Sequence, residues 1–107
     1  MRTVRRVAML VLLQIASAAP AFAGEVVQVK ISDLAFTPAE ITIHLGDTVE
    51  WVNDDFIDHT ATATRADWDL MVLKGKSAQM QLTRAGAFDY FCRFHPNMTG
   101  KIRVVGE

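Results

Sequence analysis

Apolar and polar residues alternate with a period of two over most of the chain after residue 24. The clearest case lies at residues 40–45, where Ile41 and Ile43 alternate with Thr42 and His44. A period of two places one set of side chains on each face of a β-strand. Segments that alternate in this way, or that are rich in β-branched and aromatic residues, are 26–31, 40–45, 48–52, 59–64, 77–83, 87–92 and 100–105.

Turn-forming residues separate these segments. Glycine lies in each of the short polar stretches 46–47, 74–76 and 84–86, and glycine favours turns. We interpret residues 36–38 as a break in the pattern, whereas the pattern of residues 68–73 is ambiguous. No stretch after residue 24 has a helical period. The pattern therefore predicts an all-β fold, a single sandwich or barrel of seven to eight short strands.

Residues 1–23 have a different pattern. Three arginines precede an apolar run at 7–15, and the segment ends in Ala21-Phe22-Ala23. A basic region, an apolar region and an A-x-A site are typical of a secretory signal peptide. The alternative is an anchoring helix, but the apolar run is shorter than the about 20 residues that span a bilayer. We predict a signal peptide at 1–23, a mature domain at 24–107, and a periplasmic or secreted protein.

Loss of that segment would change the charge of the chain. It removes three of the 11 basic residues and none of the 12 acidic ones, which leaves 8 basic residues and a net charge near −4. A negative domain is a poor match for nucleic acid or for an anionic membrane surface. We expect no nucleic-acid partner and no stable membrane association, whereas a protein with a basic docking face is permitted.

The single cysteine carries the most chemical information. Cys92 has no second cysteine to pair with, and it opens the pattern Cys92-x-x-His95-x-x-Met98. Sulfur and imidazole donors select copper, zinc or iron rather than magnesium or calcium. A fourth donor must come from elsewhere, and His59 is the best candidate because it starts a strand after a polar loop. Two histidines, one cysteine and a weak axial methionine describe a blue-copper centre.

Simpler interpretations of these residues stay open. Cys92 could be a buried structural thiol, Met98 could fill the core, and His59 could be a solvated loop residue. Zinc is the rival metal, although its usual ligands do not include methionine. His44 lies on the polar face of its strand, so we expect it to be exposed and not to bind metal.

Several motifs resemble those of the cupredoxins, the type 1 blue copper proteins. They are the stretch 46–53 (GDTVEWVN), the pair 59–60, and the aromatic strand 86–92 that leads into Cys92. The spacing Cys-x-x-His-x-x-Met is similar to that of amicyanin-like members, and so is the six-residue step from Asn53 to the first ligand. The resemblance implies a Greek-key sandwich and one type 1 copper ion, held by the side chains of His59, Cys92, His95 and Met98. It also implies that Asn53 ties the two ligand loops together.

Other residues depart from that family pattern. Asp58 stands where amicyanin-like chains usually have proline, Arg93 directly follows the cysteine, and the unusual segment 68–71 lies in a short connection.

Three aspartates, Asp54, Asp55 and Asp58, form either a solvated loop or an acidic patch close to the metal. We expect Trp51, Phe88 and Tyr90 to belong to the core.

These residues indicate an exported copper protein that carries single electrons. The resemblance implies transient docking of a monomer with a c-type cytochrome, an amine dehydrogenase or a terminal reductase. Electrons would leave through His95, with Phe94, Pro96 and Met98 as an apolar rim. The alternative is a periplasmic copper-binding or copper-delivery protein without an electron-transfer role. We do not expect an enzyme, because three histidines are too few for a second metal site.

Overall fold

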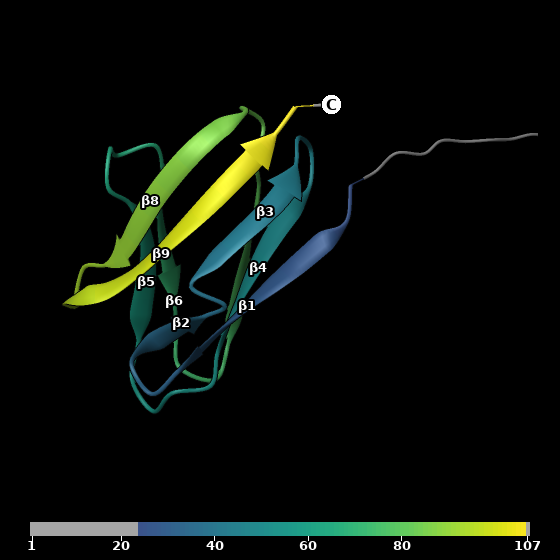
Figure 1. Ribbon diagram of the computed structural model, residues 1–107. Helices are drawn as coiled ribbons and strands as arrows, with labels where there is room; N and C mark the ends of the chain where they lie inside the picture. The colour runs from purple at the N-terminus through teal and green to yellow at the C-terminus, as the bar shows by residue number, and fades with distance from the viewer. Residues whose placement is uncertain (1–23, 107) are drawn as a thin grey trace, which may run out of the picture.

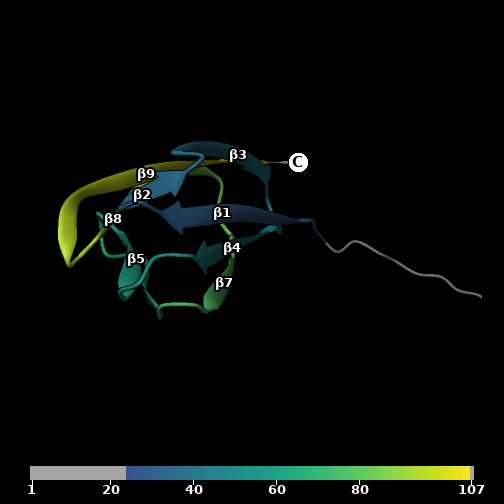
Figure 2. The same cartoon turned by 90° about the horizontal axis from the view of Figure 1, so that it is seen from below.

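Two β-sheets packed face to face form the body of the protein (Figures 1 and 2). The computed structural model describes residues 24–106, so the predicted signal peptide at 1–23 lies outside the described residues. No helix that could cross a membrane occurs in the described part of the chain. The strands are β1 (Val26–Ser32), β2 (Ala35–Thr37), β3 (Glu40–His44), β4 (Thr48–Asn53), β5 (His59–Ala63), β6 (Asp69–Val72), β7 (Ser77–Gln81), β8 (Gly86–Cys92) and β9 (His95–Val105).

The order of the strands differs from their order in the chain. One sheet has four strands in the order β2-β1-β4-β7, and the other has five in the order β3-β9-β8-β5-β6. Two neighbouring pairs are parallel, β1 with β4 and β3 with β9, and the other pairs are antiparallel. The all-β sandwich predicted from the alternation is therefore confirmed.

The number of strands is nine within the described residues rather than the predicted seven to eight. The interpretation of residues 36–38 as a break was wrong, because Ala35–Thr37 pairs with the end of β1 as strand β2. Three residues are too few to show an alternating pattern, and Pro38 directly after them is tolerated because β2 is an edge strand. The segment 68–73, left open by the sequence, contains β6, which is an edge strand of the five-stranded sheet.

Aromatic side chains fill the space between the two sheets. Trp51 and Tyr90 are fully buried and meet edge to face, with ring centroids 5.5 Å apart. Phe88 packs at the border of the same core, so the prediction that these three residues are core residues is confirmed. Burial raises the pKa of Tyr90 to about 12. Gly100 is required beside this ring, because a Cβ atom there would collide with Tyr90 Cζ.

Three adjacent strands of the five-stranded sheet bring the predicted ligands to one end of the sandwich. Strand β5 begins at His59, β8 ends at Cys92, and β9 begins at His95. Strands β5 and β8 are antiparallel, with Thr62 opposite Phe91. The start of one strand therefore lies beside the end of the next.

Candidate metal centre

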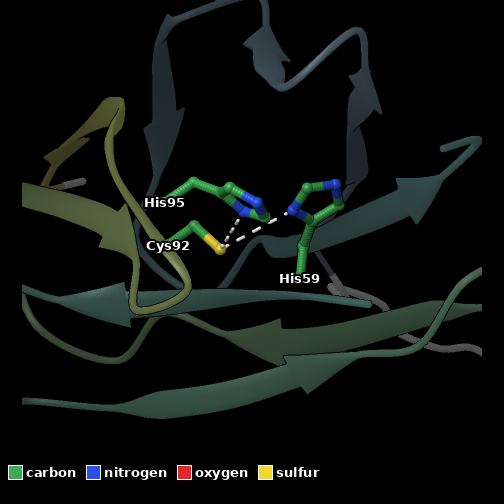
Figure 3. Close-up of side chains that lie close together, drawn as sticks. All are labelled: His59, Cys92 and His95. Carbon is green, nitrogen blue, oxygen red and sulfur yellow. Dashed lines mark hydrogen bonds between the residues drawn. The ribbon is translucent and has the colours of Figure 1, made fainter. Parts of the chain in front are cut away.

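Three side chains that are distant in sequence converge at this end of the sheet (Figure 3). Cys92 Sγ lies 3.6 Å from His59 Nδ1 and 3.8 Å from His95 Nδ1. The three donor atoms all lie within 4.8 Å of one another. His59 and Cys92 are completely buried, whereas His95 is half-buried. Donors that each bind an ion at about 2.0–2.3 Å fit a triangle of this size.

The turn between β8 and β9 explains the spacing of the second half of the motif. Cys92 and His95 are opposite each other across a two-residue turn, so their side chains share one face of the hairpin. The register then shifts, because Thr99 is the partner of Phe91. The extra residues form a bulge, which returns Met98 to the interior with 3% of its surface exposed. The four predicted ligands are thus arranged as a copper site.

A carboxylate behind His59 determines which nitrogen of its ring has a lone pair available for a metal ion. Asp55 Oδ2 lies 2.8 Å from His59 Nε2. Burial opposes ionisation of Asp55, but hydrogen bonds from the backbone N–H groups of Leu34 and Asp33 and from His59 outweigh it and lower its pKa. An ionised carboxylate can only accept, so the His59 proton resides on Nε2. The lone pair on Nδ1 therefore faces Cys92, as a metal ligand requires.

The three aspartates of the loop before β5 have separate roles. Asp54 pairs with Lys30 at 3.6 Å on the surface. Asp58 accepts a hydrogen bond from the backbone N–H of Lys74 at 2.9 Å. Asp55 alone among the three contacts a predicted ligand. The contact between Asp55 and His59 is not predicted by the sequence, although Asp55 lies four residues before His59.

The predicted role of Asn53 is corrected. Its amide donates to the carbonyl oxygens of Ile57 and Val72, and its Oδ1 accepts the backbone N–H of Asp55. Within residues 24–106, these bonds stiffen the loop before His59 and none reaches the Cys92 loop. Asn53 ends β4, which belongs to the four-stranded sheet, whereas Cys92 belongs to the five-stranded sheet.

Thr60 makes the link that was expected of Asn53. Its backbone N–H donates to Cys92 Sγ at 3.4 Å, and its Oγ1 accepts the backbone N–H of Arg93 at 2.8 Å. Thr60 is completely buried. It thus holds both the sulfur and the peptide group that follows it.

His44 is separate from this cluster, as predicted. Its side chain is 78% exposed, and its nearest ionic partner is Asp47, 3.8 Å away. The donor chemistry of the site itself fits copper, because two imidazoles, one thiol and one buried thioether are the donor set of a type 1 centre.

Comparison with known proteins agrees with this site. The sequence pattern of the cupredoxin-like domain matches residues 5–104. Amicyanin from Paracoccus denitrificans is 31% identical over 100 residues, which cover 84% of this chain and 76% of that protein. Amicyanin from Paracoccus versutus is 32% identical over 87 residues, which cover 76% of this chain and 66% of that protein.

Solved structures give the same result. The crystal structure of amicyanin from Paracoccus versutus superposes with a TM-score of 0.65 at 33% identity, covering 81% of this chain and 85% of that one. A purple cupredoxin from Nitrosopumilus maritimus has a TM-score of 0.67 over 74% of this chain and 99% of that one, but its 22% identity supports the fold alone. The chain therefore belongs to the cupredoxin family of copper electron carriers and is similar to its amicyanins.

Proposed function

We propose that the mature chain is an exported one-electron carrier that binds one copper ion through His59, Cys92, His95 and Met98. The observation that supports this most directly is the convergence of two imidazole Nδ1 atoms on one buried thiol. When bound, copper supplies a couple between Cu(II) and Cu(I). Thiolate and thioether favour the reduced ion, and imidazole suits both states.

The protein contributes a fixed arrangement of donors. Asp55 holds the ring of His59, Thr60 holds the sulfur of Cys92, and a two-residue turn fixes His95 relative to Cys92. Side chains held by buried hydrogen bonds on β-strands move little when the charge of the ion changes. A small rearrangement favours rapid electron transfer over the slow ligand exchange that a copper-delivery protein needs.

His95 is the ligand best placed to pass electrons to a partner. It is half-buried and lines a groove of about 370 Å³ with Leu34, Phe94 and Pro96. Leu34 and Phe94 are both about half exposed, at 50% and 46%. Met98 lines the same groove although only 3% of its surface is exposed, and Leu34 adds to the predicted rim of Phe94, Pro96 and Met98.

The apolar surface continues beyond His95. Leu34 also borders a second groove that contains Phe56 and Ile57. Phe56 is 93% exposed. We call the set Leu34, Phe56, Ile57, Phe94 and Pro96 the docking face.

Exposed acids lie beside one part of the docking face. Asp33, Asp54 and Asp58 are close in sequence to Leu34 and Phe56. Small apolar faces suit weak redox encounters, and rim charges mainly set the rate of association. The partner would be a c-type cytochrome, an amine dehydrogenase or a terminal reductase with a basic rim.

A visible spectrum and a self-exchange measurement test this proposal. Purified protein loaded with Cu(II) is expected to absorb intensely in the visible range through charge transfer from the Cys92 thiolate to copper. A colourless loaded protein would contradict the copper site. Slow electron self-exchange in a coloured protein would instead favour copper binding or delivery.

Export has its own test. We propose cleavage after Ala23 and residence in the periplasm or outside the cell, on the basis of the A-x-A pattern. Mass spectrometry of protein expressed from the full chain is expected to find Gly24 at the amino terminus. A chain that retains residues 1–23 in a membrane fraction would favour an anchoring helix.

A further inference from the structure

Two of the residues that depart from the amicyanin-like pattern contact each other. Arg93 directly follows Cys92, and Asp69 belongs to the unusual segment that forms edge strand β6. Arg93 Nε donates to Asp69 Oδ1 at 3.0 Å. The two side chains are 42% and 54% exposed, and an isolated pair at such exposure contributes little to stability.

Two buried hydroxyl groups connect this pair to the Cys92 loop. Thr62 faces Asp69 across the β5–β6 pairing, and its Oγ1 lies 2.7 Å from Asp69 Oδ1. The same Thr62 Oγ1 lies 2.9 Å from Thr60 Oγ1, which accepts the backbone N–H of Arg93 at 2.8 Å. The hydrogen bonds thus form a closed ring from Arg93 through Thr60, Thr62 and Asp69 back to Arg93.

The chemistry of the groups fixes the direction of the ring. The pKa of Asp69 is lowered by hydrogen bonds from the Thr62 hydroxyl and from Arg93, so the carboxylate is ionised and can only accept. The one hydroxyl proton of Thr62 must therefore point to Asp69. The hydroxyl of Thr60 then supplies the proton between the two threonines, and its oxygen is left to accept from Arg93.

The ring ends at the ligand thiol. Thr60 is the residue whose backbone N–H donates to Cys92 Sγ, and the peptide N–H of Arg93 is one bond away from Cys92. We propose that Asp69 and Arg93 are positioning residues, which hold Thr60 and the Cys92 loop in the arrangement that binds the metal. The effect of this positioning on copper binding rests on the proposed function, whereas its effect on the exposure of the Cys92 thiol does not.

A second arginine–aspartate pair provides a matched control. Arg84 Nη2 donates to Asp67 Oδ1 at 2.8 Å, and the side chains are 67% and 32% exposed. Arg84 lies 5.6 Å from the ring of Phe88, as Arg93 lies 5.6 Å from the ring of Phe94. The hydrogen bonds of Asp67 within the described residues include no threonine hydroxyl. Any larger effect of Asp69 must therefore come from the ring.

The first experiment needs no copper. Cys92 is completely buried, so its alkylation by iodoacetamide in the metal-free protein reports how often the loop opens. Asp69→Ala is expected to speed this alkylation at least tenfold, and Asp67→Ala to change it less than twofold. Asp69→Asn keeps an acceptor oxygen for Thr62 and is expected to stay within threefold of the wild type. Circular dichroism checks that each variant is folded.

The second experiment uses the copper-loaded protein. Loss of a residue that orients a metal ligand lowers metal affinity by about 10–100-fold. Asp69→Ala is therefore expected to speed copper release to a chelator at least tenfold and to shift the thiolate charge-transfer band, while Asp67→Ala does neither. Equal behaviour of the Asp69→Ala and Asp67→Ala variants in the alkylation assay would overturn the proposal. Faster alkylation with unchanged copper release and spectrum would overturn it as well. If the wild-type protein bound no copper, the proposed function would be refuted. The alkylation assay alone would then decide whether Asp69 and Arg93 position the Cys92 loop.

Discussion

The parallel strands β1 and β4 are joined by one aspartate at each end, and the surroundings of the two aspartates differ. Asp47, just before β4, accepts backbone N–H groups from Glu25 and His44 at 2.9 and 2.8 Å. Asp55, just after β4, accepts the two N–H groups of the turn at 33–34 at 2.7 and 3.0 Å. The pKa of each carboxyl is lowered, although burial is the largest influence on Asp55 and opposes the change there.

The histidine beside each aspartate makes the difference. His44 Nδ1 lies 3.8 Å from Asp47 and its side chain is 78% exposed. His59 Nε2 lies 2.8 Å from Asp55 and its side chain is completely buried. The same backbone clamp is purely structural at one end, whereas at the other end it also orients the proposed ligand His59. A carboxylate that closes a turn can therefore serve the metal site at no additional structural cost.

The turns differ as well. Near Asp47 the left-handed backbone position is filled by glycine, since Gly46 has φ 94°. Near Asp55 it is filled by Asp33 and Leu34, with φ 53° and 59°. Leucine in this region is strained, and such strain persists only where the surroundings hold it. Asp55 holds this turn through its two hydrogen bonds, and Leu34 is therefore exposed in the groove that His95 also lines.

The largest expected effect comes from removing each histidine. His59→Gly is expected to abolish the intense visible absorption of the copper-loaded protein, because the buried ligand has no substitute. His44→Gly, at the other end, is expected to leave the spectrum unchanged. Absorption spectra of both variants after titration with Cu(II) measure this. A coloured His59→Gly variant with the wild-type band would refute the ligand role of His59.

The next effect concerns the aspartates themselves. Asp55→Asn is expected to lower copper affinity by about 10–100-fold, because the amide no longer fixes the Nε2 proton of His59. Asp47→Asn should leave the affinity within a factor of two. Competition with a chelator of known affinity measures both. Equal loss in the two variants would mean that Asp55 acts only by closing its turn.

The sequence predicted the fold because alternation is a local signal. Segments 40–45 and 48–52 show which side chains face the core, whereas β2 is too short to show it and β6 is an edge strand. The Cys92 hairpin was also predictable, since all three of its donors lie within seven residues.

The residues around the ligands were not predictable in the same way. Asp55 was visible as one acid among three, and only the folded loop distinguishes it. The ring through Thr62 and Asp69 depends on the register of β5 with β6, which no local pattern specifies. The resemblance to the cupredoxins assigned the link between the loops to Asn53, whereas Thr60, which belongs to the other sheet, makes it.

A smaller effect is expected on the acid stability of the metal-free protein. Hydrogen bonds from the backbone N–H groups of His44 and Glu25 lower the pKa of Asp47. A lowered folded-state pKa gives stability that is complete above the unfolded value of about 3.9 and is lost as pH falls through the folded value. Asp47→Asn removes this titration. Urea unfolding between about pH 5 and 2 should therefore show a shallower loss of stability in the variant. An identical pH profile would mean that Asp47 titrates alike in both states.

The smallest expected effect is on the free energy of unfolding, and it comes from changing the left-handed residue in each of the two turns. Leu34→Gly relieves the left-handed strain, and after the entropy cost of glycine it should raise the free energy of unfolding by roughly 0.5–1 kcal/mol. Gly46→Ala introduces backbone strain instead of relieving it. A Cβ atom at this position meets nothing within 4 Å, so the strained φ angle is its only cost. It should lower that free energy by about 1 kcal/mol.

Electron self-exchange then distinguishes the two ends. Leu34→Gly removes part of the docking face and is expected to slow self-exchange severalfold despite the gain in stability, whereas Gly46→Ala leaves it unchanged. Urea unfolding and line broadening in mixtures of oxidised and reduced protein measure the two quantities. If Leu34→Gly were more stable and exchanged electrons as fast as the wild type, the strain at Leu34 would have no connection with docking. We expect Leu34→Gly to be more stable than the wild type and to transfer electrons more slowly. The reason is that Asp55 holds the strained turn in the position that places Leu34 against the partner.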